Sequence, residues 1–341
     1  MSSSIVYKDP HDLYDFEDIE PEVDTLRKRI NNMRKDLHRY WVDKETLIDL
    51  MTICTLAQEP LLLVGKPGTA KSDLVVKFVQ ALGLDTNSEE YFEYMLTQFT
   101  EPGEIVGPID INQLKDGRYI RRVSGKLPQA QVVFLDEIFK SNSAILNTLL
   151  TIINERKFYQ DGKPQRVPML MLFAATNEIP DNAELGALRD RFTLKAESRS
   201  VRSYAFDELL AKGLQNEVYK ATKQRPWAER ASLEDFIKLK VYLDHIFASE
   251  LEGGTHHRSR YFPEEIYVLF VRILKSLEKE FRYEVSDRKI IKLYKLIRTR
   301  AFLMHGGVVS KSDLVLLRYI SDRAEDLDAM RETVDRMLNV D

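Results

Sequence analysis

Short apolar runs alternate with helical segments along the first half of the chain. Leu61 to Val64, Val132 to Leu135 and Met169 to Ala175 each have the length and composition of a buried strand. A further strand is expected around Tyr91 to Leu96, and a helical segment separates each strand from the next. Because strands that alternate with helices pair in parallel, the pattern predicts an α/β fold built on a parallel sheet.

The last third of the chain has a different pattern. After about Arg199 the apolar residues recur at helical spacing, most clearly from Ile266 to Leu277. Charged and apolar residues also alternate at close to a helical period between Glu22 and Lys44. We therefore expect a helical lead-in over residues 1–40, an α/β domain over 41–200 and a smaller all-helical domain over 201–341.

Length and charge narrow the class of protein. The chain has 341 residues, of which 44% are hydrophobic, and its 50 Lys and Arg against 54 Asp and Glu leave a net charge of −4. This balance disfavours a nucleic-acid partner, which would need a local basic patch. The single cysteine, Cys54, cannot form an internal disulfide, and no apolar run is long enough to span a bilayer. The sequence therefore predicts a soluble cytoplasmic protein without a membrane span.

A glycine-rich segment directly follows the first apolar run and opens a helix. Its small residues let backbone N–H groups turn toward a β-phosphate at the helix N-terminus, which is typical of a phosphate-binding loop. Lys71 would then bridge the β- and γ-phosphates of ATP, and the Ser72 hydroxyl would bind Mg²⁺. Ala70 departs from the usual pattern, which has glycine before the lysine. The predicted ATP-binding residues are Gly65, Lys66, Pro67, Gly68, Thr69, Ala70, Lys71 and Ser72.

Polar residues follow two of the other predicted strands. Asp136 and Glu137 follow Val132 to Leu135, and in a parallel sheet ligands bind at the carboxyl ends of the strands. Asp136 can hold the water shell of Mg²⁺, while Glu137 can orient and deprotonate the attacking water. Asn177 reaches the same edge after Met169 to Ala175 and can hold that water against the γ-phosphate, although it could equally be a turn-forming asparagine.

Two arginines, Arg189 and Arg191, stand at the end of a short helix beyond Asn177. Because they are far along the chain from the phosphate loop, either is a candidate for an arginine finger that reaches the nucleotide of a neighbouring subunit. A planar guanidinium there would stabilise charge on the transferred phosphoryl group. Without that context, a surface salt bridge is the simpler interpretation.

Four of these motifs in succession resemble a known family. GKPGTAKS, VVFLDEIFKSNSAILNTLLTIINERKF, AATNEIP and LRDRF look like the MoxR family of AAA+ ATPases, and most resemble its regulatory-ATPase-variant branch, over about Trp41 to Leu317. The resemblance implies a P-loop AAA+ sheet flanked by helices and followed by a helical lid. It assigns Lys71 and Ser72 to Walker A, Asp136 and Glu137 to Walker B, Asn177 to sensor 1 and Arg191 to the arginine finger.

The resemblance has further implications for the loops and the lid. Residues 101–128 are similar to the helix-2 insert of a clade that includes magnesium chelatases. Asp161-Gly162 has the chemistry of a hairpin turn and resembles the same clade's insertion before sensor 1. In such rings these inserts usually face the pore or the substrate. Arg288 stands at the start of a helix where the family has its sensor 2 arginine, so it should reach the γ-phosphate of its own subunit.

The resemblance also implies a function. It implies a homo-oligomer, expected to be a hexameric ring, that hydrolyses ATP with Mg²⁺ and remodels or activates a protein with a von Willebrand factor A domain. A DNA-translocating motor of the same clade is the alternative, since the insert concentrates positive charge between Arg118 and Lys126. A scaffold that binds nucleotide without hydrolysing it is disfavoured by Glu137, which supplies a base.

Overall fold

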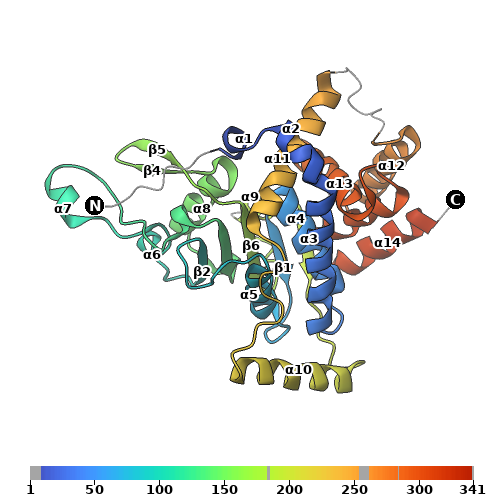
Figure 1. Cartoon of the computed structure of the whole chain (residues 1–341), viewed down its shortest axis with the longest axis horizontal. Coiled ribbons are helices and arrows are strands. Elements are labelled where there is room, and N and C mark those ends of the chain that lie inside the picture. Colours follow the sequence, from blue (N-terminus) through green and yellow to red (C-terminus); the bar gives the residue numbers. More distant parts are fainter. Residues whose placement is uncertain (1–8, 183–184, 253–260, 283, 340–341) are drawn as a thin grey trace.

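A five-stranded sheet lies at the centre of the computed structural model, which describes residues 9–182, 185–252, 261–282 and 284–339 (Figure 1). The strands of this sheet are β1 (Leu61–Val64), β2 (Tyr91–Met95), β3 (Val132–Asp136), β6 (Met171–Thr176) and β7 (Leu194–Glu197). Their order is β2-β3-β6-β1-β7, and every neighbouring pair is parallel. The predicted parallel α/β fold is therefore confirmed. The apolar pattern did not predict β7, a four-residue strand with Lys195 at its second position.

Helices surround this sheet and make up the described chain after β7. The α-helices are α1 (Pro10–Leu13), α2 (Phe16–Ile19), α3 (Val23–Leu37), α4 (Glu45–Ala57), α5 (Lys71–Ala81), α6 (Pro102–Val106), α7 (Ile111–Lys115), α8 (Ser143–Glu155), α9 (Gly186–Arg191), α10 (Phe206–Ala221), α11 (Leu233–Glu252), α12 (Glu264–Phe281), α13 (Asp287–His305) and α14 (Leu327–Asn339). Short 3₁₀ segments are η1 (Glu20–Glu22), η2 (His38–Tyr40), η3 (Leu127–Gln129), η4 (Ile138–Lys140) and η6 (Lys311–Tyr319). Of the helices described, none is long and apolar enough to cross a membrane.

The sheet buries both faces, which explains why its strands read as continuous apolar runs. Alternate residues of β1 enter different clusters: Leu61 and Leu63 pack with α4 and α5, whereas Leu62 and Val64 pack with α8 and α9. All four are fully or almost fully buried. Strands in which apolar and polar residues strictly alternate would instead have predicted a sheet with one solvent-exposed face.

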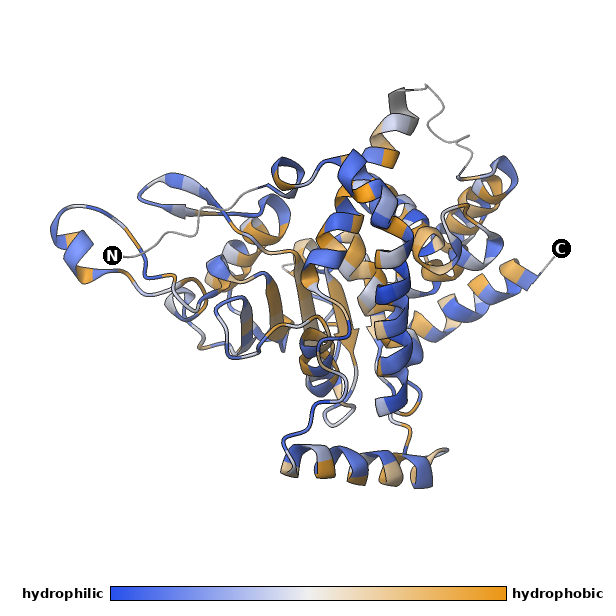
Figure 2. Ribbon diagram, viewed as in Figure 1, coloured by the Kyte–Doolittle hydropathy of each residue, from blue (hydrophilic) through white to orange (hydrophobic). Residues whose placement is uncertain are grey.

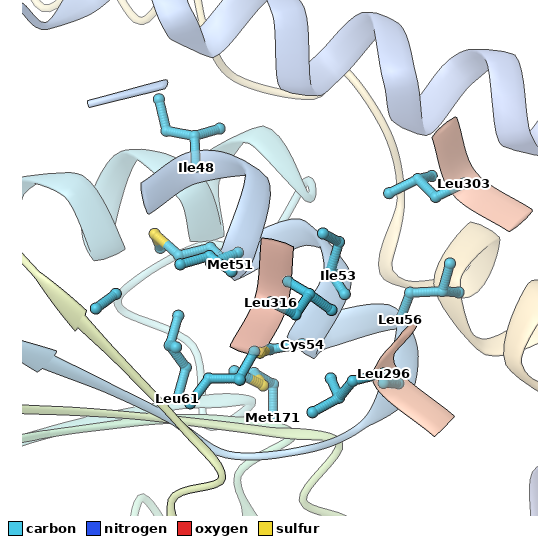
Figure 3. Close-up of a cluster of buried hydrophobic side chains, with 14 of the residues drawn as sticks. Ile48, Met51, Ile53, Cys54, Leu56, Leu61, Met171, Leu296, Leu303 and Leu316 are labelled. Carbon is cyan, nitrogen blue, oxygen red and sulfur yellow. The ribbon is translucent and has the colours of Figure 1, made fainter. Parts of the chain in front are cut away.

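Helix α4 joins the sheet to the helices that follow residue 200. Figure 3 shows Met51 and Cys54 of α4 packed between Leu61 and Met171 of the sheet and the lid residue Leu316. The two long helices α11 and α13 also contact α3 and α4. The described residues after 200 therefore share one continuous core with the N-terminal helices. The domain boundaries expected at residues 40 and 200 stay predictions.

Two insertions project from the sheet on the side away from the lid (Figure 1). One is the segment that carries α6 and α7, and the other is the antiparallel hairpin of β4 (Lys157–Gln160) and β5 (Lys163–Arg166). The hairpin turns at Asp161 and Gly162, with φ of 50° and 70°. Positive φ at both central residues is the geometry of the tight turn that the sequence predicts here.

A buried cluster of charges ties the edge strand β7 to the lid. The Lys195 ammonium donates to Asp322 at 2.5 Å and to the Phe192 carbonyl at 2.8 Å, and Lys289 lies 3.2 Å from the same carboxylate. One carboxylate cannot neutralise two buried ammonium groups. Burial, followed by the charge of Lys289, lowers the pKa of Lys195 to about 7.

This cluster predicts a pH-dependent stability. Between pH 7 and the ordinary lysine pKa of about 10.4, the unfolded chain binds a proton at Lys195 that the folded chain releases, so the free energy of unfolding rises with pH. Lys195→Met should remove that rise, which we expect to be about 2 kcal/mol between pH 7 and pH 9. Urea denaturation of both proteins at the two pH values measures it. The exposed Lys275→Met is the control; equal pH slopes in the parental and Lys195→Met proteins would contradict the prediction.

Candidate functional site

The glycine-rich loop joins β1 to α5 at the carboxyl edge of the sheet. The Gly65 amide donates to the Thr176 carbonyl at 3.1 Å, and the Ser198 hydroxyl donates to the Thr69 carbonyl at 2.7 Å. A Cβ atom on Gly65 would lie 2.4 Å from the Ser198 carbonyl oxygen, so only glycine fits there. The ends of β6 and β7 thus hold the loop on both sides.

Ala70 stands where the usual pattern has glycine, and its backbone adopts a conformation that glycine favours. It has φ 66° and ψ 21°, in the left-handed region, and it is the N-cap of α5. Glycine adopts this conformation without cost, whereas a residue with a Cβ pays roughly 1–2 kcal/mol for it. The loop therefore keeps the shape that glycine would give it and carries local strain at this one position.

Three side chains converge where β1, β3 and β6 end. The Lys71 ammonium donates to Asn177 Oδ1 at 3.3 Å, and the Asn177 amide in turn donates to Glu137 Oε1. Lys71 also contacts the Gly65 carbonyl at 2.5 Å. Its side chain is 7% exposed, and burial lowers its pKa, partly offset by Asp136 and Glu137. Asn177 thus links the predicted phosphate ligand to the predicted base.

Asp136 and Ser72 are the predicted metal ligands. Asp136 ends β3 and uses one carboxylate oxygen to accept the Glu137 amide at 2.9 Å. Ser72 lies in the first turn of α5, next to Lys71. In the described part of the chain, no three His, Cys, Asp or Glu residues are grouped as a metal site. This donor set fits Mg²⁺, which is usually held by one or two protein oxygens together with phosphates and water.

A cavity of about 280 Å³ adjoins the phosphate loop. The loop residues 68–70 line one side, the segment Tyr40 to Val42 lines another, and α10 covers it with Leu209 and Gly213. Two hydrogen bonds hold α10 in place, from Lys212 and Asn216 to carbonyls of that segment. The sequence pattern did not predict this cavity, because Trp41 falls within the helical period of apolar residues between Glu22 and Lys44. An aromatic pair just before the helix that leads to β1 was the available signal.

Arg191 and Arg288 lie near enough to each other to interact electrostatically, away from the phosphate loop. Arg288 is close enough to contribute to the lowered pKa of Arg191, after the larger effect of burial. The Ser286 hydroxyl, at the start of α13, also donates to Asp190 at 3.1 Å. In the described chain, the Nε atom of Arg191 is buried without a hydrogen-bond partner.

Strand register places this arginine pair at the opposite edge of the sheet. Leu194, which begins β7, pairs with Leu61 at the start of β1, whereas the phosphate loop follows Val64. Arg191 precedes β7, so roughly 10 Å of strand separates its edge from the loop. The Ser286–Asp190 contact holds the start of α13 near this edge. The expectation that Arg288 reaches the γ-phosphate of its own subunit stays a prediction.

Arg189, the other finger candidate, is bound within its own chain. Its guanidinium donates to the Pro180 carbonyl at 2.5 Å and to Asp181 at 3.4 Å. These contacts anchor the segment that follows Asn177. Arg191, by contrast, has one weak side-chain contact within the described residues, to Asp190 at 3.4 Å.

Two sequence models of protein families match the chain. The model described as the MoxR domain in the MoxR-vWA-beta-propeller ternary systems matches residues 28–238. A model of an AAA lid domain matches residues 265–334. The first covers more than half of the chain and includes every residue of the convergent site. The more specific resemblance to the regulatory-variant branch stays a prediction.

Relatives and a solved structure agree with these matches. Uncharacterized proteins MJ0812 and MJ0079 of Methanocaldococcus jannaschii are each 34% identical to this chain, over 85% and 86% of it and 70% of each relative. Structural protein ORF618 of Acidianus two-tailed virus is 27% identical over 83% of this chain and 46% of its own. The crystal structure of a candidate ATPase from Cytophaga hutchinsonii superposes with a TM-score of 0.67, at 15% identity, over 97% of this chain and 99% of that one. The last similarity concerns the fold alone.

The strain at Ala70 generates a prediction. Ala70→Gly should raise the free energy of unfolding by about 0.5–1 kcal/mol, because relief of the left-handed conformation exceeds the entropy that glycine adds to the unfolded chain. Ala248→Gly, at an exposed position of α11, should instead lower it by about 1 kcal/mol. Urea titrations of both variants compare the two signs. A loss of stability in both would mean that Ala70 is not strained.

Proposed function

Since the chain belongs to the MoxR family of AAA+ ATPases, we propose that it hydrolyses ATP with Mg²⁺ in a ring whose active sites each need two subunits. One observation carries the proposal. Lys71, Asn177 and Glu137 form one hydrogen-bonded group at the carboxyl edge of the sheet, whereas Arg191 and Arg288 lie at the opposite edge. A single chain therefore cannot bring all five groups to one nucleotide.

The chemistry divides among the converged residues. Lys71 would leave its loop carbonyls and bind the β- and γ-phosphates, and the N-terminus of α5 would add its partial positive charge. Glu137 would take a proton from the water that attacks the γ-phosphorus, as the bond to the ADP oxygen breaks. Asn177 already donates to Glu137, so its amide is within reach of a water held between them. Mg²⁺, bound by Ser72 and Asp136, would neutralise phosphate charge.

The cavity beside the loop suits the nucleoside. Tyr40, Trp41 and Val42 supply apolar surface for a base on one wall, and α10 supplies the other. Because α10 opens the helical part of the chain, nucleotide bound here would contact both the sheet and the helices that follow it. A change in the nucleotide can then shift these helices relative to the sheet.

The surface of α10 supports assembly with further copies of the chain. Figure 2 shows hydrophobic residues on this helix, which stands apart from the body of the molecule. Phe206, Leu210, Leu214 and Val218 recur every four residues and are 52–60% exposed. An exposed apolar stripe of this kind marks an interaction surface. Because α10 lines the nucleotide cavity, a second subunit that reaches the nucleotide can also cover this stripe.

The arginine pair supports the same arrangement from the other side. Arg191 and Arg288 repel each other in a partly buried position, and Asp190 is the one carboxylate of the described residues within ion-pair distance of Arg191. A phosphate group of the next subunit would remove this repulsion. We therefore propose that both arginines contact the nucleotide of the neighbouring subunit. From the family resemblance we propose a ring of six subunits.

The partner is proposed from the description of the matching family model. That description joins a MoxR domain with vWA and beta-propeller proteins, so we propose that this ring remodels or activates a protein with a von Willebrand factor A domain in the cytoplasm. The DNA-translocating motor stays the alternative. A severalfold rise of the ATPase rate with DNA, lost steeply with salt, would favour the motor.

Mixed rings test the shared active site. Glu137→Gln should keep ATP binding and lose turnover, because the amide cannot accept the proton. Arg191→Ala should also bind ATP and lose turnover. Co-assembled, the two variants should regain part of the activity, since some boundaries join an intact base to an intact finger. Phosphate release from the mixture, compared with each variant alone, measures the recovery.

Arg189→Ala is the control for Arg191→Ala, because its side chain is bound to its own chain's Pro180 and Asp181. No recovery from rings that demonstrably contain both variants would contradict the shared site. Loss of turnover in Arg189→Ala with normal turnover in Arg191→Ala would move the finger two residues back and leave the ring proposal intact.

The α10 surface generates a second prediction. Leu210→Ser combined with Leu214→Ser should leave single subunits at concentrations where the parental protein assembles, because the stripe loses its central apolar side chains. The matched control is Ile111→Ser with Leu114→Ser, an exposed apolar pair on α7. Sedimentation with a slowly hydrolysed ATP analogue compares the three proteins. Unchanged assembly of the α10 variant would exclude this face from the subunit boundary.

A further inference from the structure

A groove of about 870 Å³ separates the two insertions that project from the sheet. The insert segment from Asp110 to Gln129 forms one wall, and the hairpin from Phe158 to Arg166 forms the other. We propose that this groove binds an acidic peptide segment of the protein that the ring acts on. The inference rests on the proposed remodelling function, because it names the partner's contact chemistry.

Hydrogen bonds between the two insertions fix the walls of the groove relative to each other. The Asp161 amide donates to the Tyr119 carbonyl at 2.8 Å, and the Tyr119 amide donates to the Asp161 carboxylate at 3.0 Å. The Arg121 amide also donates to the Gln160 side chain at 3.0 Å. These contacts join segments about forty residues apart and hold both walls in one relative position, so that a ligand would meet preformed walls.

Positive charge dominates the groove, although the chain as a whole has a net charge of −4. Two carboxylates, Asp110 and Asp161, face five cations across the lining. The five cations are Arg118, Arg121, Arg122, Lys163 and Arg166. Such a local excess attracts an acidic ligand and raises its rate of association.

The cations differ in how far they are already paired. Arg122 lies 3.0 Å from Asp110. For Arg118 and Lys163, both exposed, no carboxylate of the described chain lies within ion-pair distance. Arg166 contacts the carboxylate of Asp9 at 2.7 Å. A side-chain carboxylate near the start of the described chain thus already pairs with one of the cations of the groove.

Two features favour a peptide over a nucleic acid. Gln113 and Gln129 line the groove, and each has a buried side-chain oxygen without a hydrogen-bond partner in the described chain. A rotation of these side chains toward the groove would let a peptide N–H donate to their oxygens, whereas a phosphodiester backbone has no donor. The ring of Tyr119, which could stack on a base, is covered by the Arg121 guanidinium at 5.4 Å.

The test measures binding without nucleotide, so that it does not depend on hydrolysis. A fluorescein-labelled oligoglutamate peptide, an oligoglutamine peptide of equal length and single-stranded oligothymidylate are titrated with the full chain by fluorescence anisotropy. We expect oligoglutamate to bind, with an affinity that falls as salt is added, and oligoglutamine not to bind. Arg118→Gln with Lys163→Gln should raise the dissociation constant by about three- to tenfold, as the loss of two exposed ion pairs predicts.

The matched control is Arg272→Gln with Lys275→Gln, which removes the same two charge types from α12, away from the insertions (Figure 1). Its affinity should equal that of the parental chain. The inference is overturned if oligoglutamate does not bind, if both double variants bind it alike, or if oligothymidylate binds more tightly than oligoglutamate. The ATPase rates of the parental chain and of the groove variants are measured separately. Because the groove variants leave the Lys71–Asn177–Glu137 group intact, normal ATP hydrolysis without oligoglutamate binding would reject the groove proposal alone.

Discussion

Asn177 can hydrogen-bond to Lys71 and Glu137 together only because β6 lies between β1 and β3. Glu137 and Asn177 directly follow β3 and β6, and Lys71 follows the loop after β1. Neighbouring strands in a sheet lie less than 5 Å apart. A strand inserted between β6 and either of these neighbours would take Asn177 out of hydrogen-bond reach of Lys71 or Glu137. The proposed chemistry of the site therefore depends on the order of strands more than on any single residue.

The same strand order makes one subunit insufficient. All five strands are parallel, so everything that follows a strand lies at one edge and everything that precedes a strand lies at the other. The glycine-rich loop and Glu137 follow their strands, whereas Arg191 precedes β7. Contact between Ser286 and Asp190 then carries Arg288 to the edge of Arg191. Complementary edges of two copies fit this division.

Movement of the helical part is coupled to the rest of the chain through a shared core. Helix α4 packs against the sheet with one face and against α13 with another, and Cys54 lies fully buried between them (Figure 3). The ion cluster of Lys195, Asp322 and Lys289 adds a second link at the edge strand. A shift of the lid relative to the sheet must rearrange both contacts, since close-packed interiors do not deform continuously.

Local sequence determined the loop, the strand ends and the hairpin turn. Glycine spacing after an apolar run predicted the phosphate loop, and the position of Asp136, Glu137 and Asn177 after buried runs predicted which edge they occupy. These are short-range properties, because a strand's apolar pattern and the residue that follows it are adjacent in the chain. Strand β7 was not predicted, because Lys195 interrupts its apolar pattern. The burial of Lys195 depends on Asp322, which lies 127 residues away in the chain.

Only the tertiary structure decided which of these residues meet. The chain has no local signal for strand order, so the Lys71–Asn177–Glu137 group and the separation of Arg288 from the phosphate loop appear only when the sheet is assembled. The same holds for the cavity under α10 and for the groove between the insertions, whose walls are brought together by contacts between distant segments. Pairing between strands and packing between helices are long-range interactions. A single sequence shows which residues can take part in such contacts, but it does not show which distant residues they will meet.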